Sequence, residues 1–325
     1  MMRSLSGIQP SGTLHIGNYF GAIKQFIDFQ SKYDGFYFIA DYHALTSHPS
    51  PAQLTKNTYD VVLDYLAFGL DPEKSTLFLQ SDVPEVTELT WILSNVTPIA
   101  LLERAHSYKD KVAKGIAANH GLFTYPILMA SDILIYNSDI VPVGKDQKQH
   151  VEMARDIAIK FNSIYGDIFK LPKELIKDTM AVVPGIDGQK MSKSYNNTIE
   201  MFAPKKSLKK QIMKIVTDST PLEEPKNPDI CNVFALYKLF ATETQLEEMR
   251  RKYLGGNYGY GHAKKELLEI ILEYFKPYRE RREELVNNMD YVKKVLKDGA
   301  EKARSVATEK IIEVKKAVGL VGNIY

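Results

Sequence analysis

Residues 6–19 read Ser-Gly-Ile-Gln-Pro-Ser-Gly-Thr-Leu-His-Ile-Gly-Asn-Tyr. A short, partly apolar run precedes them at residues 2–6, and an amphipathic run follows at residues 16–29. Two glycines and a proline separate these runs, which predicts a strand, a tight turn and a helix. Such a turn sets the unpaired N–H groups of a helix N-terminus beside a strand end, where they favour an anion such as a phosphate. An ordinary strand-to-helix connection is the alternative, so the turn alone does not decide the function.

Strand and helix patterns continue to alternate after this turn. Residues 35–41 and 75–80 are apolar runs typical of strands buried on both faces, and residues 51–70 carry apolar side chains at helical spacing. This alternation predicts an α/β protein with a doubly wound parallel sheet of the Rossmann-like class. Ligands bind such sheets beyond the carboxyl ends of the strands, so we expect residues 7–11, 41–43 and 80–82 to meet in one crevice. His43 lies in one of these segments, with a position in a surface loop as the alternative.

Composition sets broad limits on the class of protein. The 325 residues are 44% hydrophobic and 25% charged, as expected for one large or two modest globular domains, and a net charge of +2 does not by itself indicate a polyanionic partner. The single cysteine, Cys231, excludes an intrachain disulfide and a metal site with several cysteines. With no secretory leader and no apolar run near the roughly 18 residues of a membrane helix, we expect a cytoplasmic protein without membrane contact.

Asp132 lies inside an otherwise apolar helical run at residues 125–136. An unpaired buried carboxylate would cost at least several kcal/mol or stay protonated, so it needs a backbone N–H, a cation or a ligand donor as its partner. Capping of a helix by Ser131 or Asp132 is the alternative.

A second strand, glycine turn and helix are predicted over residues 139–161. Gly144 has no side chain and permits close approach to its backbone, and Asp146 is placed to accept hydrogen bonds from ribose hydroxyls. With the first turn, this makes two turns on one sheet that could flank a nucleotide. Residues 180–183 read as a last strand.

Two motifs resemble the signatures of a known family. Thr-Leu-His-Ile-Gly-Asn at residues 13–18 resembles the His-Ile-Gly-His signature of class I aminoacyl-tRNA synthetases, and Lys-Met-Ser-Lys-Ser at residues 190–194 resembles their second signature. More narrowly, residues 6–12 and the run Val-Pro-Val-Gly-Lys-Asp-Gln at residues 141–147 resemble the bacterial-type tryptophanyl branch of this family. The resemblance runs end to end. Asn18 departs from the second histidine of the general signature but is similar to the tryptophanyl branch.

The resemblance implies ATP-dependent ligation of L-tryptophan to tRNA(Trp) through tryptophanyl-adenylate, with release of pyrophosphate and AMP. No protein nucleophile is needed, so catalysis would rest on positioning and charge stabilisation. We expect catalytic roles for Gln9, His15, Lys190 and Lys193, with Lys193 as the preferred transition-state residue. Mg²⁺ should be held mainly by the ATP phosphates, with no dedicated protein metal site. The expected ATP-binding residues are Gln9, Pro10, Ser11, Gly17, Asn18, Lys111, Gly144, Lys145, Asp146, Val182, Lys190, Met191, Ser192, Lys193 and Ser194.

The resemblance also implies the role of each residue around the amino acid. Asp132 would accept the indole N–H, and three apolar residues would pack the ring. Tyr125 and Gln147 would hold the ammonium and carboxylate ends. The expected tryptophan-binding residues are Leu5, His43, Tyr125, Met129, Asp132, Val141, Val143 and Gln147.

The domains follow from the same resemblance. Residues 1–185 would form the catalytic domain, with a helical insertion at about residues 83–136 that supplies a homodimer interface. Trp91 and Leu93 would fit that interface, and core packing is the alternative for both. Residues 186–196 would form a mobile loop, residues 197–288 a helical anticodon-binding domain, and residues 289–325 a C-terminal helix that returns toward the catalytic domain.

Two other functions remain open at this point. A tyrosyl relative would share both signatures and an aspartate in the pocket, but Met129 suits an indole ring better than a phenol. A nucleotide-binding regulatory or RNA-binding module without catalysis is the other alternative, and the intact lysines of the second signature argue against it. The amphipathic run at residues 289–320 is consistent with phosphate contacts, or with a merely solvated face. Its basic residues are Lys293, Lys294, Lys297, Lys302, Arg304, Lys310 and Lys315.

Overall fold

A five-stranded parallel sheet forms the centre of the described protein. The computed structural model describes residues 1–105, 108–109, 119–144, 147–176 and 183–322, and within them the strand order is β3-β2-β1-β4-β5. The order reverses between β1 and β4, so a crevice is expected where the carboxyl ends of these two strands diverge. The doubly wound class predicted above is confirmed. The strands are β1 (Arg3–Ile8), β2 (Asp34–Ile39), β3 (Ser75–Leu79), β4 (Ile140–Pro142) and β5 (Lys173–Leu175).

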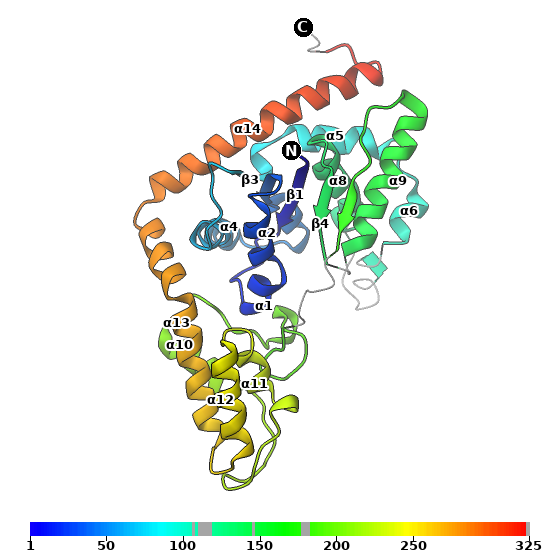
Figure 1. The fold of residues 1–325 in the computed structure, drawn as a ribbon. Coiled ribbons are helices and arrows are strands. Elements are labelled where there is room, and N and C mark those ends of the chain that lie inside the picture. The colour runs from blue at the N-terminus through cyan, green and yellow to red at the C-terminus, as the bar shows by residue number, and fades with distance from the viewer. Residues whose placement is uncertain (106–107, 110–118, 145–146, 177–182, 323–325) are drawn as a thin grey trace.

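Each face of the sheet packs against its own layer of helices (Figure 1). Successive residues of β2 alternate between the layers: Tyr37 and Ile39 pack on one side and Phe36 and Phe38 on the other. The first layer contains α1 (Ile16–Asn18), a π-helix (Tyr19–Ile23), α2 (Lys24–Phe29) and α4 (Pro51–Ala67). The second contains α5 (Glu85–Ser94), α6 (Ile99–Glu103), α8 (His120–Ile135) and α9 (Lys148–Tyr165). The short α3 (Asp41–Ala44) follows β2 directly.

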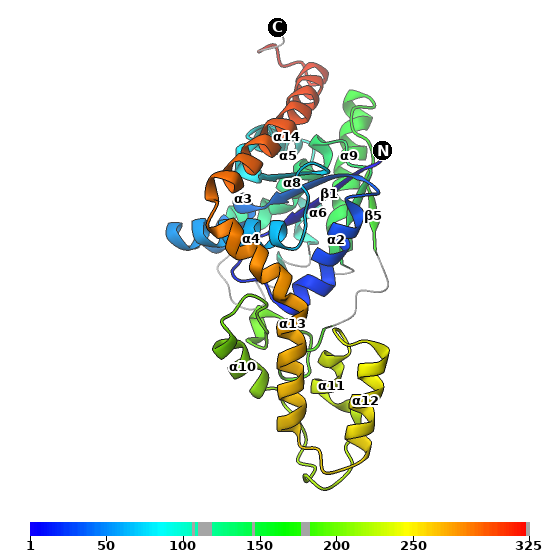
Figure 2. The same ribbon diagram turned by 60° about the vertical axis from the view of Figure 1, so that its left-hand side comes forward.

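A helical lobe lies beyond the carboxyl edge of the sheet (Figure 2). The long helix α13 packs against α10 and α11 in the lobe and against α4 in the first layer, so one hydrophobic cluster runs through both parts. The lobe contains α10 (Lys205–Met213), α11 (Asn232–Tyr237), α12 (Glu243–Leu254) and α13 (Tyr260–Val286).

The last helix, α14 (Met289–Ala317), turns back and crosses the sheet domain. It packs on β3 and α5, and an added Cβ at Gly299 would lie 1.9 Å from the Leu77 carbonyl oxygen, so glycine permits this close approach. Arg304 pairs with Glu85 of α5 at 3.0 Å, which also fixes the helix. Lys310 differs from the expectation of a solvated basic face, because it is buried and its ammonium donates to the Ile168 carbonyl oxygen at 2.9 Å.

Several predicted elements differ in detail. The amphipathic run at residues 16–29 is interrupted by the π-helix, a feature frequent at functional sites. Of the strand predicted at residues 180–183, only Val183 lies within the described residues. A strand that was not predicted, β5, pairs with β4. Among the helices of the described ranges, none is long and apolar enough to cross a membrane.

Candidate active site

The turn after β1 is tied to two neighbouring helices. Gln9 donates from Nε2 to the carbonyl oxygen of His43 in α3 at 3.1 Å, and the Pro10 carbonyl oxygen accepts from Asn57 Nδ2 of α4 at 3.2 Å. Gly12 adopts a φ of +113°, which strongly favours glycine. Ser11 closes the turn through its N–H, which donates to the Gln9 carbonyl oxygen at 2.8 Å. The predicted nucleotide turn is therefore held at a strand end by contacts to α3 and α4.

His15, Gly17 and Asn18 form the start of the first helix. Asn18 accepts the backbone N–H of His15 at its Oδ1, at 3.0 Å, which fixes the helix start. Gly17 lies against the second signature, because its N–H meets Met191 Sδ at 3.4 Å and an added Cβ would approach Met191 Cβ to 3.3 Å. Burial of His15, and then the charge of Lys193, lower the pKa of this histidine to about 4. The imidazole is therefore neutral at pH 7.

The second signature reaches the first through Lys193. Its ammonium donates to the Gly12 carbonyl oxygen at 2.9 Å. Ser192 caps a short 3-10 helix, Lys193–Tyr195, by accepting the N–H of Ser194 at 3.3 Å, and Asn197 accepts the N–H of Ser192 at 2.7 Å. Lys190 stands at the start of this segment, exposed. The loop thus has a defined conformation that directs one lysine into the crevice.

Backbone pairing also joins the two signatures. The N–H of Ile16 donates to the carbonyl oxygen of Ile199 at 3.0 Å, and His15 and Glu200 form an isolated antiparallel bridge. Burial lowers the pKa of Lys193, while Asp64 and Glu200 oppose that change. The two signatures lie about 180 residues apart in the sequence, and the structure brings their charged groups into one site.

Asp132 has two polar partners at the carboxyl edge of the sheet. Its carboxylate lies 2.9 Å from His43 Nε2 and accepts from Gln80 Nε2 at 2.9 Å at each oxygen. Burial raises the pKa of this carboxyl group, and the bonds from His43 and Gln80 oppose the rise. The capping alternative is wrong, because Ser131 and Asp132 lie in the interior of α8 and Ser131 donates to the Ile127 carbonyl oxygen. His43 belongs to the crevice and not to a free surface loop.

Four apolar residues of the expected amino-acid pocket belong to or pack against one hydrophobic cluster. Leu5 and Val141 lie on the paired strands β1 and β4 and are buried, and Met129 and Val143 pack against the same cluster from partly buried positions. Tyr125 places its hydroxyl 2.6 Å from Nε2 of a histidine in α9, His150.

Comparison with known proteins identifies the family. A family model described as "tRNA synthetases class I (W and Y)" matches residues 1–276. The chain belongs to this family of class I synthetases.

Individual synthetases of known name extend the match over the whole chain. The tryptophan–tRNA ligase of Fusobacterium nucleatum is 69% identical over 326 residues, covering 100% of both chains. The tryptophan–tRNA ligase of Campylobacter jejuni is 55% identical, covering 98% of this chain and 100% of its own. A crystal structure of the tryptophanyl-tRNA synthetase from C. jejuni, complexed with ADP and tryptophan, superposes with a TM-score of 0.95 at 55% identity, covering 98% of this chain and 100% of that one.

Four expected site residues of this synthetase, Lys111, Lys145, Asp146 and Val182, lie outside the described residues. Gly144 and Gln147 flank part of that gap, and the Gln147 N–H donates to the Gly144 carbonyl oxygen at 2.9 Å, as expected for a tight turn after β4. The roles of all six toward a nucleotide or an amino acid stay predictions.

The sequence analysis placed Gln80 at the crevice of this synthetase but gave it no role. It is 1% exposed, bonds both oxygens of Asp132 and accepts the Tyr42 N–H at its own Oε1 at 3.1 Å. The signal that would have found it is a polar residue at the carboxyl end of a buried strand, opposite a carboxylate in an apolar helix.

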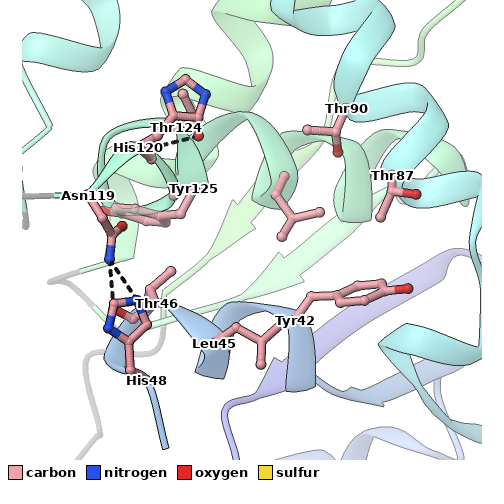
Figure 3. A pocket seen from close by; sticks show the side chains of 12 residues that line it. Tyr42, Leu45, Thr46, His48, Thr87, Thr90, Asn119, His120, Thr124 and Tyr125 are labelled. Carbon is pink, nitrogen blue, oxygen red and sulfur yellow. Dashed lines mark hydrogen bonds between the residues drawn. The ribbon is translucent and has the colours of Figure 1, made fainter.

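A cavity of about 520 Å³ opens on the other side of Tyr125, between α5, α8 and the segment after β2 (Figure 3). Asn119 lines one end of the cavity, and its Nδ2 lies 3.4 Å from both the Thr46 carbonyl oxygen and His48 Nε2. Its walls come from Tyr42, Leu45, Thr46, His48, Thr87, Thr90, Asn119, His120, Gly121, Thr124, Tyr125 and Leu128. Tyr125, an expected tryptophan-binding residue, lines this cavity, whereas Asp132 and Met129 do not.

Proposed function

We propose that this chain is a tryptophan–tRNA ligase that works in two steps. The carboxylate of L-tryptophan attacks the α-phosphate of ATP, which gives tryptophanyl-adenylate and pyrophosphate. A ribose hydroxyl of tRNA(Trp) then takes the aminoacyl group and AMP leaves. The names of the full-length relatives support this activity. The observation that carries it is the meeting of the two signatures, where Lys193 bonds to Gly12 at the carboxyl edge of the sheet.

Charge stabilisation is the main catalytic task in this proposal. Lys193 and Lys190 would compensate the negative charge that builds up on departing pyrophosphate, while Gln9 and His15 would position the phosphates. Because His15 is neutral at pH 7, the lysines carry the positive charge of this set. Pro10, Ser11, Gly17 and Asn18, with Met191, Ser192 and Ser194 of the second signature, would shape the ATP site around them.

Mg²⁺ belongs to the proposal as a companion of ATP. Among the described residues, no group of three or more His, Cys, Asp or Glu side chains could hold a metal ion. Mg²⁺ in nucleotide sites commonly takes most of its ligands from phosphate oxygens and water, so we assign it to the ATP phosphates. When bound, the ion would neutralise part of the triphosphate charge.

Selectivity for tryptophan would come from the surroundings of Asp132. A carboxylate offers about four lone-pair positions for hydrogen bonds. His43 and Gln80 together occupy three of them, which leaves one for an indole N–H. Leu5, Met129, Val141 and Val143 supply apolar walls for the ring. Tyr125 and Gln147 would hold the polar ends of the amino acid.

Charging of tRNA is the direct test of the proposed activity. Purified protein, ATP, Mg²⁺ and labelled tryptophan should convert tRNA(Trp) to an acid-precipitable product. The same mixture with labelled tyrosine and tRNA(Tyr) should give none. Charging with tyrosine in place of tryptophan would favour the tyrosyl relative, and charging with neither would contradict a ligase.

We further propose that the protein is a homodimer that uses the insertion between β3 and β4. Trp91 of α5 is 73% exposed, whereas Leu93 is fully buried in the core, so core packing accounts for Leu93 and only Trp91 remains for the interface. Buried aromatic anchors carry much of the energy of protein interfaces. Trp91→Glu should therefore shift the protein toward monomer in sedimentation-velocity runs at micromolar concentration, with Trp91→Phe as the control that stays dimeric. A Trp91→Glu protein that sediments as wild type would exclude this interface.

The helical lobe, residues 197–288, would bind the anticodon, and the start of α14 would bind phosphates of the tRNA backbone. Lys293, Lys294 and Lys297 are exposed there. Reversing all three charges should weaken tRNA charging and flatten its salt dependence, because a protein that neutralises fewer phosphates releases fewer ions on binding. ATP–pyrophosphate exchange should stay unchanged, since it needs no tRNA. Unchanged charging at moderate salt would mean that this face is only solvated.

Tryptophan, ATP and tRNA(Trp), the proposed substrates, meet in the compartment where translation takes place. We therefore place the reaction in the cytoplasm.

A further inference from the structure

Arg282 joins three segments that are far apart in the sequence. From α13, its Nε donates to Asp64 of α4 at 2.6 Å and its Nη2 donates to Asp60, one turn earlier in α4, at 2.8 Å. The guanidinium also lies over the ring of Phe202, 5.2 Å from its centroid. Asp64 is 2% exposed, so this ion pair is buried on the α4 side.

The third segment, residues 199–203, connects the two signatures. Its Ile199 carbonyl oxygen accepts the Ile16 N–H of the first signature, and residues 190–194 of the second signature precede it in the chain. One turn before Arg282, Arg279 donates to the carbonyl oxygens of Met201 and Ala203. Two arginines of α13 therefore fasten the stretch that aligns both signatures.

The ion pair with Arg282 favours the ionised form of Asp64. Burial raises the pKa of Asp64 to about 7, and Arg282 and Lys193 both act to lower it. In return, Asp64 acts to raise the pKa of Lys193. Without Arg282, the pKa of Asp64 would rise further, so at pH 7 this carboxyl group would take up a proton and lose its ion pair with α13.

We propose that Arg282 is a positioning residue for adenylate formation, which holds residues 199–203 beside α4 and so keeps the two signatures aligned. The inference rests on the proposed function, since it assigns a step of that reaction. Arg282 touches neither signature lysine, so it acts through the segment that it holds. The helical lobe is thereby coupled to the ATP site through α13.

The test uses ATP–pyrophosphate exchange with Arg282→Met. We expect kcat to fall roughly ten- to hundredfold, the range in which a small misplacement of a catalytic group acts, with the KM for tryptophan unchanged. Adding Asp64→Asn to that variant should not restore kcat, because the loss comes from the released segment and not from a charge on Asp64. Arg282→Lys, which keeps the charge but not the fork of donors, should fall between the wild type and Arg282→Met.

Arg250→Met is the matched control. Arg250 pairs with Asp229 at 2.7 Å and lies over the ring of Phe234 at 5.3 Å, but both of these partners belong to the helical lobe. We expect wild-type kcat for this variant.

Three results would overturn the inference. They are wild-type kcat in folded Arg282→Met, recovery of kcat in the double variant, and an equal loss in Arg250→Met. Melting temperatures of all variants establish which of them are folded at the assay temperature. If Arg282→Met is not folded there, Arg282→Lys and its combination with Asp64→Asn decide the same question. A wild-type protein without tryptophan-dependent exchange would instead refute the proposed function.

Discussion

Replacing Lys193 with alanine should lower the kcat of tryptophan-dependent ATP–pyrophosphate exchange on the order of a hundredfold, the usual cost of removing one charge-stabilising contact in a transition state. The structure places the Lys193 ammonium 2.9 Å from the Gly12 carbonyl oxygen, inside the turn that would cradle the phosphates. Tryptophan binding should change little, because Asp132 and its partners lie on another part of the crevice. Exchange rates measured at several tryptophan concentrations separate kcat from the KM for tryptophan.

An exposed lysine on α10, Lys209, provides the control for this substitution. Lys209→Ala removes the same charge from the surface of the helical lobe and should leave exchange as it is. If Lys193→Ala keeps the wild-type kcat, or if the loss appears in the KM for tryptophan, Lys193 does not stabilise the transition state.

Asp132→Asn should weaken tryptophan binding roughly ten- to hundredfold, which corresponds to the 1.5–3 kcal/mol typical of a hydrogen bond to a charged group. Asparagine has nearly the same shape and keeps one oxygen, but its amide N–H groups would face the donors of Gln80 or His43. Discrimination should fall as well. The wild type should reject a tryptophan analogue with sulfur in place of the indole nitrogen, since a buried acceptor would be left unpaired, and the variant should reject it less.

Ser131→Ala is the neighbouring control for Asp132→Asn, because Ser131 is equally buried in α8 but bonds within the helix and to Thr90. It should leave the preference for tryptophan unchanged. A purely structural role of Asp132, as the partner of His43 and Gln80, would give a lower melting temperature with the same preference between tryptophan and its analogue. That outcome would contradict the indole contact.

The sequence predicted those features that a long, regular pattern produces. β2 and β3 are apolar runs bounded by turns, and α14 has a clear apolar stripe, so each was found with small errors at its ends. β5 was missed because Lys173–Leu175 is a short edge strand whose residues are exposed or half-buried, which leaves no apolar run. Lys310 was misplaced because helical periodicity does not show that a carbonyl oxygen of another segment, Ile168, lies within reach.

The candidate site divides in a similar way. The motifs located both signatures, and the rule on strand ends brought Gln9, His43 and Gln80 to one edge of the sheet. The partners of Asp132 could not be assigned, since a buried carboxylate shows only that some donor is needed and not which one. Nothing in the sequence pattern around Arg282 indicated a role for it. Its partner Asp64 lies 218 residues away, and one arginine in a helix with several others resembles any solvated charge.

The central claim, that this crevice activates tryptophan with ATP, is tested most directly by ATP–pyrophosphate exchange with each of the twenty amino acids in turn. Labelled pyrophosphate enters ATP only when an aminoacyl-adenylate forms and reverts, so tRNA is not needed. We predict strong exchange with tryptophan and background exchange with tyrosine, phenylalanine and the rest. Exchange that depends on tyrosine, or no exchange with any amino acid by a folded protein, would contradict that claim.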